Sequence, residues 1–181
     1  MAPEPKRKLA YTDILATPDD GKRYELIEGE LFVNPAPTPI HQRISKRLQR
    51  QLEDYFEARS LGEVFNAPID VILTPHDVLQ PDLILVGDPS HISKRGIEKP
   101  PLIVVEILSP STRNVDRGIK SRRYAELGVP HYWIVDPEHR RIECYRLAES
   151  AFKHEVDAQG DTTLAHPAWE GLIVDLAALW R

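Results

Sequence analysis

An acidic residue inside an apolar segment is the feature that most constrains how this chain can fold. Residues 102–108 read Leu-Ile-Val-Val-Glu-Ile-Leu, which is typical of a strand buried on both faces. A bare carboxylate in such a strand costs on the order of several kcal/mol. Glu106 must therefore be neutral, paired, metal-bound or directed out of the sheet. Because the loop residues Ser-Pro-Ser-Thr follow directly, we expect a site at the carboxyl edge of the sheet.

A second acid occupies a similar position. Asp82 follows Pro81 and opens the apolar segment 82–86. Two carboxylates about 4 Å apart repel by about 4 kcal/mol at an effective dielectric constant of about 20. A divalent cation turns this repulsion into a binding site, and carboxylate and water oxygens suit Mg²⁺ or Mn²⁺. The alternative is that Asp82 caps a turn and Glu106 pairs with a lysine or arginine.

The remaining pattern predicts a mixed sheet with helices packed on it, in the α/β or α+β class. Apolar periodicity indicates helices at 38–59 and 114–128, and a short helix between Thr12 and Pro18. Expected strands are a hairpin at 24–33 around Glu28-Gly29, a strand or bent pair at 63–75 broken at Pro68, and segments 82–86, 102–108, 131–137 and 141–147. A further hairpin after Phe152 is possible, and the type of segment 172–180 stays open.

Length and composition exclude several classes of protein. The 181 residues suit one domain, with residues 1–10 as a loose tail. No stretch is long and apolar enough for a membrane span or a secretory signal, so we expect a cytoplasmic protein without a membrane partner. The single cysteine, Cys144, cannot form an internal disulfide. A net charge of -5 argues against coating nucleic acid by bulk charge, but it permits a local basic face.

The helix expected at 38–59 carries a basic stripe. Arg43, Lys46, Arg47 and Arg50 follow the helical period, and no acid interrupts residues 41–50. Such a stripe can track a phosphate backbone, although an ordinary solvated helix face has the same pattern. His41 opens this helix, where it either faces the same cleft or has a structural role.

The helix expected at 114–128 is also locally basic. Asp116 and Lys120 are four residues apart and share a face with Tyr124. Lys120 can reach back over the sheet edge, where its ammonium would stabilise a phosphate or position a water molecule. The alternative is an ordinary surface pair between Lys120 and Asp116.

These residues together resemble the PD-(D/E)XK nuclease superfamily, and within it a bacterial branch of restriction-endonuclease-like proteins. The resemblance extends over about residues 24–147. Its specific part is "VVEILSPSTR" followed by "DRGIKSRRYAELGVPHYWIVD", preceded by Pro81-Asp82. It implies a restriction-endonuclease-like mixed sheet flanked by helices, with an N-terminal β-hairpin, and Mg²⁺-dependent phosphodiester hydrolysis.

The resemblance also assigns roles to residues. Asp82 takes the place of the motif aspartate, Glu106 that of the motif glutamate, and the carbonyl of Ile107 that of a further metal ligand. Leu108 stands where the motif lysine belongs, so the resemblance makes Lys120 its replacement. Glu28 resembles a further acid of this branch, although a tight Glu-Gly turn explains it equally well.

We therefore expect a metal-dependent endonuclease that acts on nucleic acid, DNA rather than RNA, with Asp82, Glu106 and Lys120 as its catalytic residues. The phosphate backbone would be held by Arg43, Arg47, Arg50 and Arg113, and His41, Glu28 and Tyr124 would form an outer part of the site. A homodimer would supply one site for each strand. Two alternatives remain: a catalytically inactive nucleic-acid-binding or scaffold module, and a metal-free two-carboxylate glycosidase. We rank the glycosidase last, because Trp133 lies in an apolar strand and no aromatic platform adjoins the acids.

Overall fold

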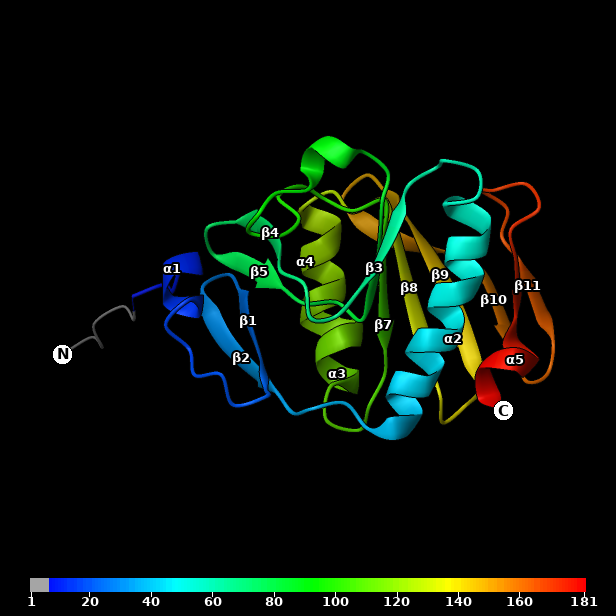
Figure 1. Ribbon diagram of the computed structural model, residues 1–181, viewed down its shortest axis with the longest axis horizontal. Coiled ribbons are helices and arrows are strands. Elements are labelled where there is room, and N and C mark those ends of the chain that lie inside the picture. The colour runs from blue at the N-terminus through cyan, green and yellow to red at the C-terminus, as the bar shows by residue number, and fades with distance from the viewer. Residues whose placement is uncertain (1–6) are drawn as a thin grey trace.

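A six-stranded sheet separates two layers of the computed structural model, which describes residues 7–181 (Figure 1). Within the sheet only β7 and β8 run parallel, and the other neighbouring strands are antiparallel. The predicted mixed sheet is thus confirmed. Its spatial order is β10 (Ala151–Gln159), β9 (Arg141–Ala148), β8 (His131–Asp136), β7 (Ile103–Ile107), β6 (Leu83–Val86) and β3 (Glu63–Asn66).

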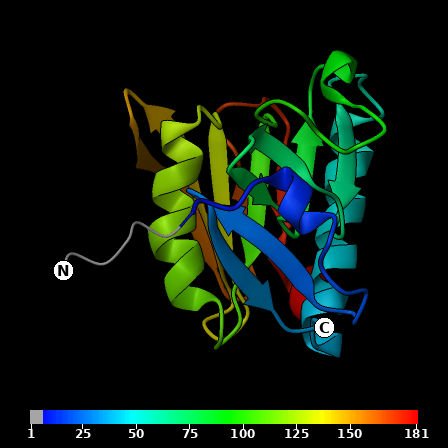
Figure 2. The ribbon, with the colours of Figure 1, turned by 90° about the vertical axis from the view of Figure 1, so that its left-hand side faces the viewer.

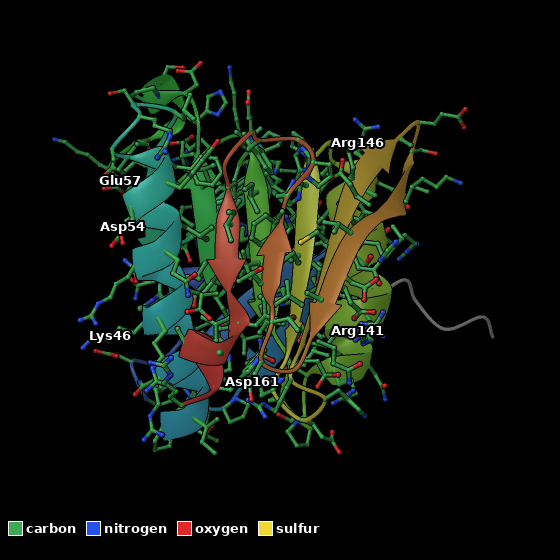
Figure 3. All side chains as sticks on the ribbon, turned by 90° about the vertical axis from the view of Figure 1, so that its right-hand side faces the viewer. Lys46, Asp54, Glu57, Arg141, Arg146 and Asp161 are labelled. Atoms are coloured by element: carbon green, nitrogen blue, oxygen red, sulfur yellow. The ribbon has the colours of Figure 1, made fainter. Side chains whose placement is uncertain are left out.

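One face of this sheet is covered by helix α2 (Pro39–Phe56) and the C-terminal segment (Figure 3). That segment comprises β11 (Thr163–Ala165), β12 (Ile173–Asp175) and α5 (Leu176–Trp180). Alternate residues of the central strands point to this layer, among them Leu83, Val105 and Trp133. Thr38 begins α2 by accepting a hydrogen bond from the backbone amide of His41 at 3.3 Å.

The opposite face is covered by one continuous helical segment and a smaller sheet (Figure 2). The helical segment consists of α3 (Arg113–Val115), a π-helical turn η2 (Asp116–Lys120) and α4 (Ser121–Glu126). Gly128 follows with a left-handed φ of 84°, as expected for a helix stop. The smaller sheet has the order β2 (Glu30–Asn34), β1 (Arg23–Ile27), β5 (Asp77–Leu79) and β4 (Val71–Thr74).

The predicted N-terminal hairpin is present. Ile27 pairs with Glu30, which leaves Glu28 and Gly29 as a two-residue loop with φ values of 55° and 82°. Two consecutive left-handed residues are the geometry of a tight hairpin turn whose twist matches the flanking strands. The turn therefore accounts for the Glu-Gly sequence without any role in a site.

Other segments differ from the expectations in detail. Segment 63–75 forms two strands that belong to different sheets, and β5 was not predicted because three residues are too few to show a period. Segment 172–180 divides into β12 and α5. The N-terminal helix α1 spans Tyr11–Ile14, and a 3₁₀ turn η1 spans Pro89–His91.

The tail expected to be loose is only partly described, since residues 1–6 lie outside the described part. Residues 7–10 do not behave as a loose tail, because the amide of Leu9 donates to the carbonyl of Gly29 at 2.9 Å. The carbonyl of Leu9 also lies 2.6 Å from Nδ1 of His76. Within residues 7–181, every helix is too short or too polar to cross a bilayer.

Candidate active site

The two predicted metal ligands lie together at the strand ends. Leu83 of β6 pairs with Val105 of β7, so the next position in the antiparallel register places Asp82 opposite Glu106. Both side chains are buried, with 3% of Asp82 and 2% of Glu106 exposed. The negative charge of two adjacent buried acids must be balanced by cationic groups or hydrogen-bond donors. The residues around Asp82 and Glu106 provide these in two different ways.

Asp82 is held by cationic groups on its outer side. Its Oδ1 accepts a hydrogen bond from Nη1 of Arg23 at 2.7 Å, and its Oδ2 lies 3.0 Å from Nε2 of His41. The amide of Ile107 also donates to Oδ2, at 2.8 Å. Burial alone would raise the pKa of Asp82, but His41, Arg23 and this amide outweigh it and lower the pKa. Asp82 is therefore a carboxylate.

Glu106 is held from the side of the π turn and α4. Its Oε1 accepts from Nζ of Lys120 at 3.1 Å and from the hydroxyl of Tyr124 at 3.1 Å. Burial raises the pKa of Glu106 well above its ordinary value; Lys120 opposes this shift, and the nearby carboxylates of Asp116 and Asp82 add to it. The sequence-based expectation that Lys120 reaches back over the sheet edge agrees with this geometry.

Lys120 is the centre of an anionic cluster. Its Nζ lies 2.9 Å from Oε2 of Glu25, 3.1 Å from Glu106 and 3.5 Å from Oδ1 of Asp116. Burial would lower the pKa of Lys120, but the three carboxylates outweigh it and raise the pKa. Both Lys120 and Asp116 are buried, so the alternative of a surface pair does not hold.

The helical segment beside the acid cluster contains a π turn. Asp116 and Lys120 are its first and last residues, and both side chains point inward while Arg117 lies outside. The wider turn changes the phase of the helix between α3 and α4. Local π turns of this kind are frequent at functional sites.

The acid of the N-terminal hairpin that reaches the cluster is Glu25, whereas Glu28, the predicted outer residue, lies outside the cluster. Glu25 is fully buried, accepts from the amide of Gln80 at 2.7 Å, and is contacted by Nδ2 of Asn34. Glu28 sits half-buried in the hairpin turn and pairs with Nη2 of Arg122 at 2.9 Å. The signal for Glu25 was weak, because its strand reads Arg-Tyr-Glu-Leu-Ile and is less apolar than the strand of Glu106.

A pocket of about 590 Å³ opens beside Asp82. The side of α2 that faces it carries His41, Ser45 and Lys46, while Glu106 and Lys120 lie behind Asp82 and do not line it. The remaining wall comes from the hairpin and from the bend between β3 and β4, including Lys22, Arg23, Ala67, Pro68 and Gln80. Asp82, Arg23 and His41 therefore form the boundary between the solvent-accessible pocket and the buried cluster.

The four predicted phosphate-binding arginines are not brought to this pocket. Arg43, Arg47 and Arg50 do not line the pocket, although Lys46 of the same stripe does. Arg47 donates to the carbonyl oxygens of Leu179, at 3.0 Å, and of Arg181. Arg113 pairs with Asp136 at 2.9 Å and with Glu138 at 2.7 Å. The helical period identified the basic stripe correctly but could not show which face borders the pocket.

The charges of the cluster fit a divalent cation. Four carboxylates, those of Glu25, Asp82, Glu106 and Asp116, face two permanent cations, Arg23 and Lys120, which leaves a formal charge of -2. Oδ1 of Asp116 is buried and has no hydrogen-bond partner among residues 7–181. Within that range no three acidic or histidine side chains here bring ligand atoms within 4.8 Å of one another. A cation bound by one or two carboxylates and several waters is the usual pattern for Mg²⁺.

A mixed sheet flanked by helices, with two acids at adjacent strand ends and a lysine beside them, defines a restriction-endonuclease-like protein. The chain belongs to the Uma2 family, described as "Putative restriction endonuclease", whose sequence profile matches residues 11–177. It is similar to a solved structure from Anabaena variabilis ATCC 29413, described as "a putative nuclease belonging to DUF820". That match has a TM-score of 0.76 and 18% identity, and it covers 95% of this chain and 97% of the other.

The chain is also similar in sequence to a curated protein. The chain is 29% identical over 126 residues to the uncharacterized protein slr1290 of Synechocystis. The match covers 68% of this chain and 66% of that protein, so it spans slightly less than two thirds of the relative's length.

Proposed function

We propose that this protein is a metal-dependent phosphodiester hydrolase that cuts DNA. The observation that carries the proposal is the pairing of Asp82 with Glu106 at adjacent strand ends, beside the buried Lys120 and next to an open pocket. The description of the family as restriction endonucleases supports a nuclease and favours DNA as the substrate. Cutting both strands of a duplex takes two sites or two visits, so we propose a homodimer, which sedimentation analysis would test.

Asp82, Glu106 and the carbonyl of Ile107 would hold Mg²⁺ or Mn²⁺. An extended residue directs its N–H and its carbonyl to the same side of a strand. Since the amide of Ile107 faces Asp82, its carbonyl is directed to the same side. The ion would polarise a phosphoryl oxygen and lower the pKa of a bound water.

The residues of the chain divide the remaining work. Lys120 stays protonated because its pKa is raised, so it acts as a fixed positive charge and not as a base. Tyr124 orients Glu106 through its hydroxyl. Arg23 and His41 stand on the pocket side of Asp82, where a phosphate diester would approach, and Lys46 adds a further positive charge to the wall. These contacts recognise the backbone and not the base sequence.

A second candidate function is a catalytically inactive nucleic-acid-binding module. The observation that favours it is that both oxygens of Asp82 already contact a side chain that can carry positive charge, one Arg23 and the other His41. A module of this kind would bind nucleic acid through the pocket rim and would leave the phosphodiester intact.

A cleavage screen separates the two candidates. Supercoiled plasmid, single-stranded DNA and RNA are incubated with wild type in Mg²⁺ or Mn²⁺, beside Glu106→Gln and the matched exposed-acid control Glu63→Gln. The hydrolase cuts at least one DNA substrate only with metal, loses this activity in Glu106→Gln and keeps it in Glu63→Gln. Absence of cleavage by wild type, together with retained binding in a mobility-shift assay, would establish the inactive module instead.

A further inference from the structure

A second cluster of side chains lies on the other face of the six-stranded sheet. It brings together His131 at the start of β8, Glu155 of β10 and His166, which follows β11. One ligand atom from each lies within 4.8 Å of the others. Nδ1 of His131 and Nε2 of His166 are 3.5 Å and 3.6 Å from Oε2 of Glu155.

These three atoms are buried, and within residues 7–181 none of them has a hydrogen-bond partner. A buried polar atom that lacks a partner costs roughly 1–3 kcal/mol. Separations of 3.5 and 3.6 Å are too long for good hydrogen bonds. Three orphaned atoms that converge on one point therefore indicate a missing partner between them.

The spacing distinguishes a metal ion from a water molecule. With bonds of about 2.0–2.1 Å, each histidine nitrogen and Oε2 of Glu155, which are 3.5 and 3.6 Å apart, subtend roughly 120° at a metal ion, close to tetrahedral geometry. With hydrogen bonds of about 2.9 Å, the same atoms would subtend only about 75° at a water molecule. The first angle suits a four-coordinate ion, and the second is too acute for a water.

The local backbone is shaped to bring Glu155 to this point. The pairing of β10 with β9 shifts between His154 and Val156, so Glu155 is the extra residue of a β-bulge. A bulge redirects the side chain that it carries and is common near functional sites. On the other sides, the His166 ring stacks on Trp133 at 5.1 Å, and Trp169 lies 4.5 Å from His131 and 4.6 Å from His166, measured between ring centroids.

We propose that His131, Glu155 and His166 bind a transition-metal ion, with Zn²⁺ as the best match, at a site separate from the acid cluster. Two imidazoles and one carboxylate are ligands that Zn²⁺ prefers, and Mg²⁺ does not. The bound ion fastens the segment between β11 and β12 to the central sheet, because its ligands come from β8, β10 and that segment. A fourth position is left for water or another small ligand.

Metal binding has a specific consequence at His166. The amide of Ala168 donates to Nδ1 of His166 at 3.2 Å, so without metal the ring proton lies on Nε2. A metal ion at Nε2 requires the proton on Nδ1 instead, and the contact with Ala168 must open. The histidine ¹⁵N chemical shifts therefore report metal binding independently of any effect on folding.

The experiment uses the full chain with Glu106→Gln as the background, so that the proposed catalytic ion does not contribute. After removal of metal with a chelator, Co²⁺ is titrated and followed by visible absorption, and Zn²⁺ is then added as a competitor. We expect one Co²⁺ per chain with the intense bands of a four-coordinate ion, displaced by Zn²⁺, and a change of the His166 tautomer.

The isosteric change Glu155→Gln should weaken Co²⁺ binding by at least about 100-fold. His154→Gln, on the same strand but in an exposed pair with Asp157, is the matched control and should bind as the background does. Circular dichroism establishes that each variant is folded. Failure of the background protein to bind Co²⁺ or Zn²⁺, or equal binding by Glu155→Gln, would overturn the site, whatever the outcome of the cleavage screen.

Discussion

The two faces of the central sheet bury polar side chains in opposite ways. On the face of α4, four carboxylates are compensated by Lys120 and Arg23, and most of their oxygens have partners. On the face of α2, the cluster of His131, Glu155 and His166 leaves three atoms without any partner among residues 7–181. In the first cluster, ion pairs within the cluster balance the charges. In the second cluster, three buried polar atoms have no hydrogen-bond partner among residues 7–181.

This difference indicates what each cluster contributes to the protein. Internal ion pairs hold the acid cluster together without an added ion, and its excess of formal negative charge is where we propose that an exchangeable cation binds. The histidine cluster has no internal compensation, so a tightly bound ion is the simplest way to satisfy it. Four predictions test the comparison, from the largest expected effect to the smallest.

The largest effect is expected from Lys120→Met. Removal of one partner from a buried ion pair typically costs about 3–5 kcal/mol, and here three carboxylates lose their shared cation. The free energy of unfolding, measured by urea denaturation, should fall by this amount. Lys153→Met, an exposed residue of β10, should change it by less than about 0.5 kcal/mol. A loss below about 1 kcal/mol for Lys120→Met would mean that the acids are already neutral.

The next effect concerns activity and not stability. Glu106→Gln keeps the shape of the side chain but removes the charge that would hold the metal, so DNA cleavage should fall by at least about 10²-fold. Stability should change little or rise, because burial disfavours the charged form of Glu106. Initial cleavage rates and urea midpoints of the same preparations measure both quantities. Unchanged cleavage would remove Glu106 from the reaction.

The two clusters should also give opposite pH dependences in metal-free protein. The pKa of Glu106 is raised above 4.5, so the folded chain binds more protons than the unfolded one above that pH, and stability falls as the pH rises. Burial lowers the pKa of His131 and of His166 to about 4, so the folded chain binds fewer protons between about pH 4 and 6.5, and stability rises there with pH.

For each histidine, a pKa lowered from 6.5 to about 4 corresponds to a stability difference of about 3 kcal/mol. We expect the free energy of unfolding, measured from pH 4 to pH 8, to fall less steeply with pH in Glu106→Gln than in wild type. It should rise less steeply with pH in His131→Asn. If His131→Asn left the profile between pH 4 and 6.5 unchanged, the proposed neutral burial of the histidine would be refuted.

The smallest effect is expected at the hairpin turn. Glu28 pairs with Arg122 at the surface, where such pairs contribute about 0–1 kcal/mol. Glu28→Gln should keep full cleavage activity and lose less than about 1 kcal/mol of stability, whereas Glu25→Gln should impair both. Cleavage rates of the two variants side by side decide which acid of the hairpin serves the site.

Much of the acid cluster could be predicted from the sequence. Burying a charge costs so much free energy that a single acid in an apolar segment already indicates a site. Glu106, Asp82 and Lys120 were found in this way or through the family resemblance, and the mixed sheet followed from the order of elements. Glu25 lies in a strand that also begins with Arg23, so its charge stands out less, and the family resemblance and the neighbouring turn directed attention to Glu28. The orientation of α2 toward the pocket could not be predicted, since it depends on packing of the whole domain.

The histidine cluster could not have been predicted from the sequence. Its three residues are separated by 24 and 11 positions along the chain, and no spacing motif links them. Glu155 points to the cluster only because of the β-bulge, and bulges leave no clear trace in a period-two pattern. Likewise, a regular helix was expected at 114–128, and nothing in its sequence indicated a π turn.

That π turn has a consequence for how related chains can be compared. Deleting one residue between Asp116 and Lys120 would remove the extra residue of the π turn and place the lysine three positions after Asp116, so its ammonium would be displaced relative to Glu106 with every amino acid of the site still present. A single-codon gap in a related chain can therefore alter the acid cluster. An alignment that scores only residue identity at positions 82, 106 and 120 would overlook it, and counting the helix length identifies it.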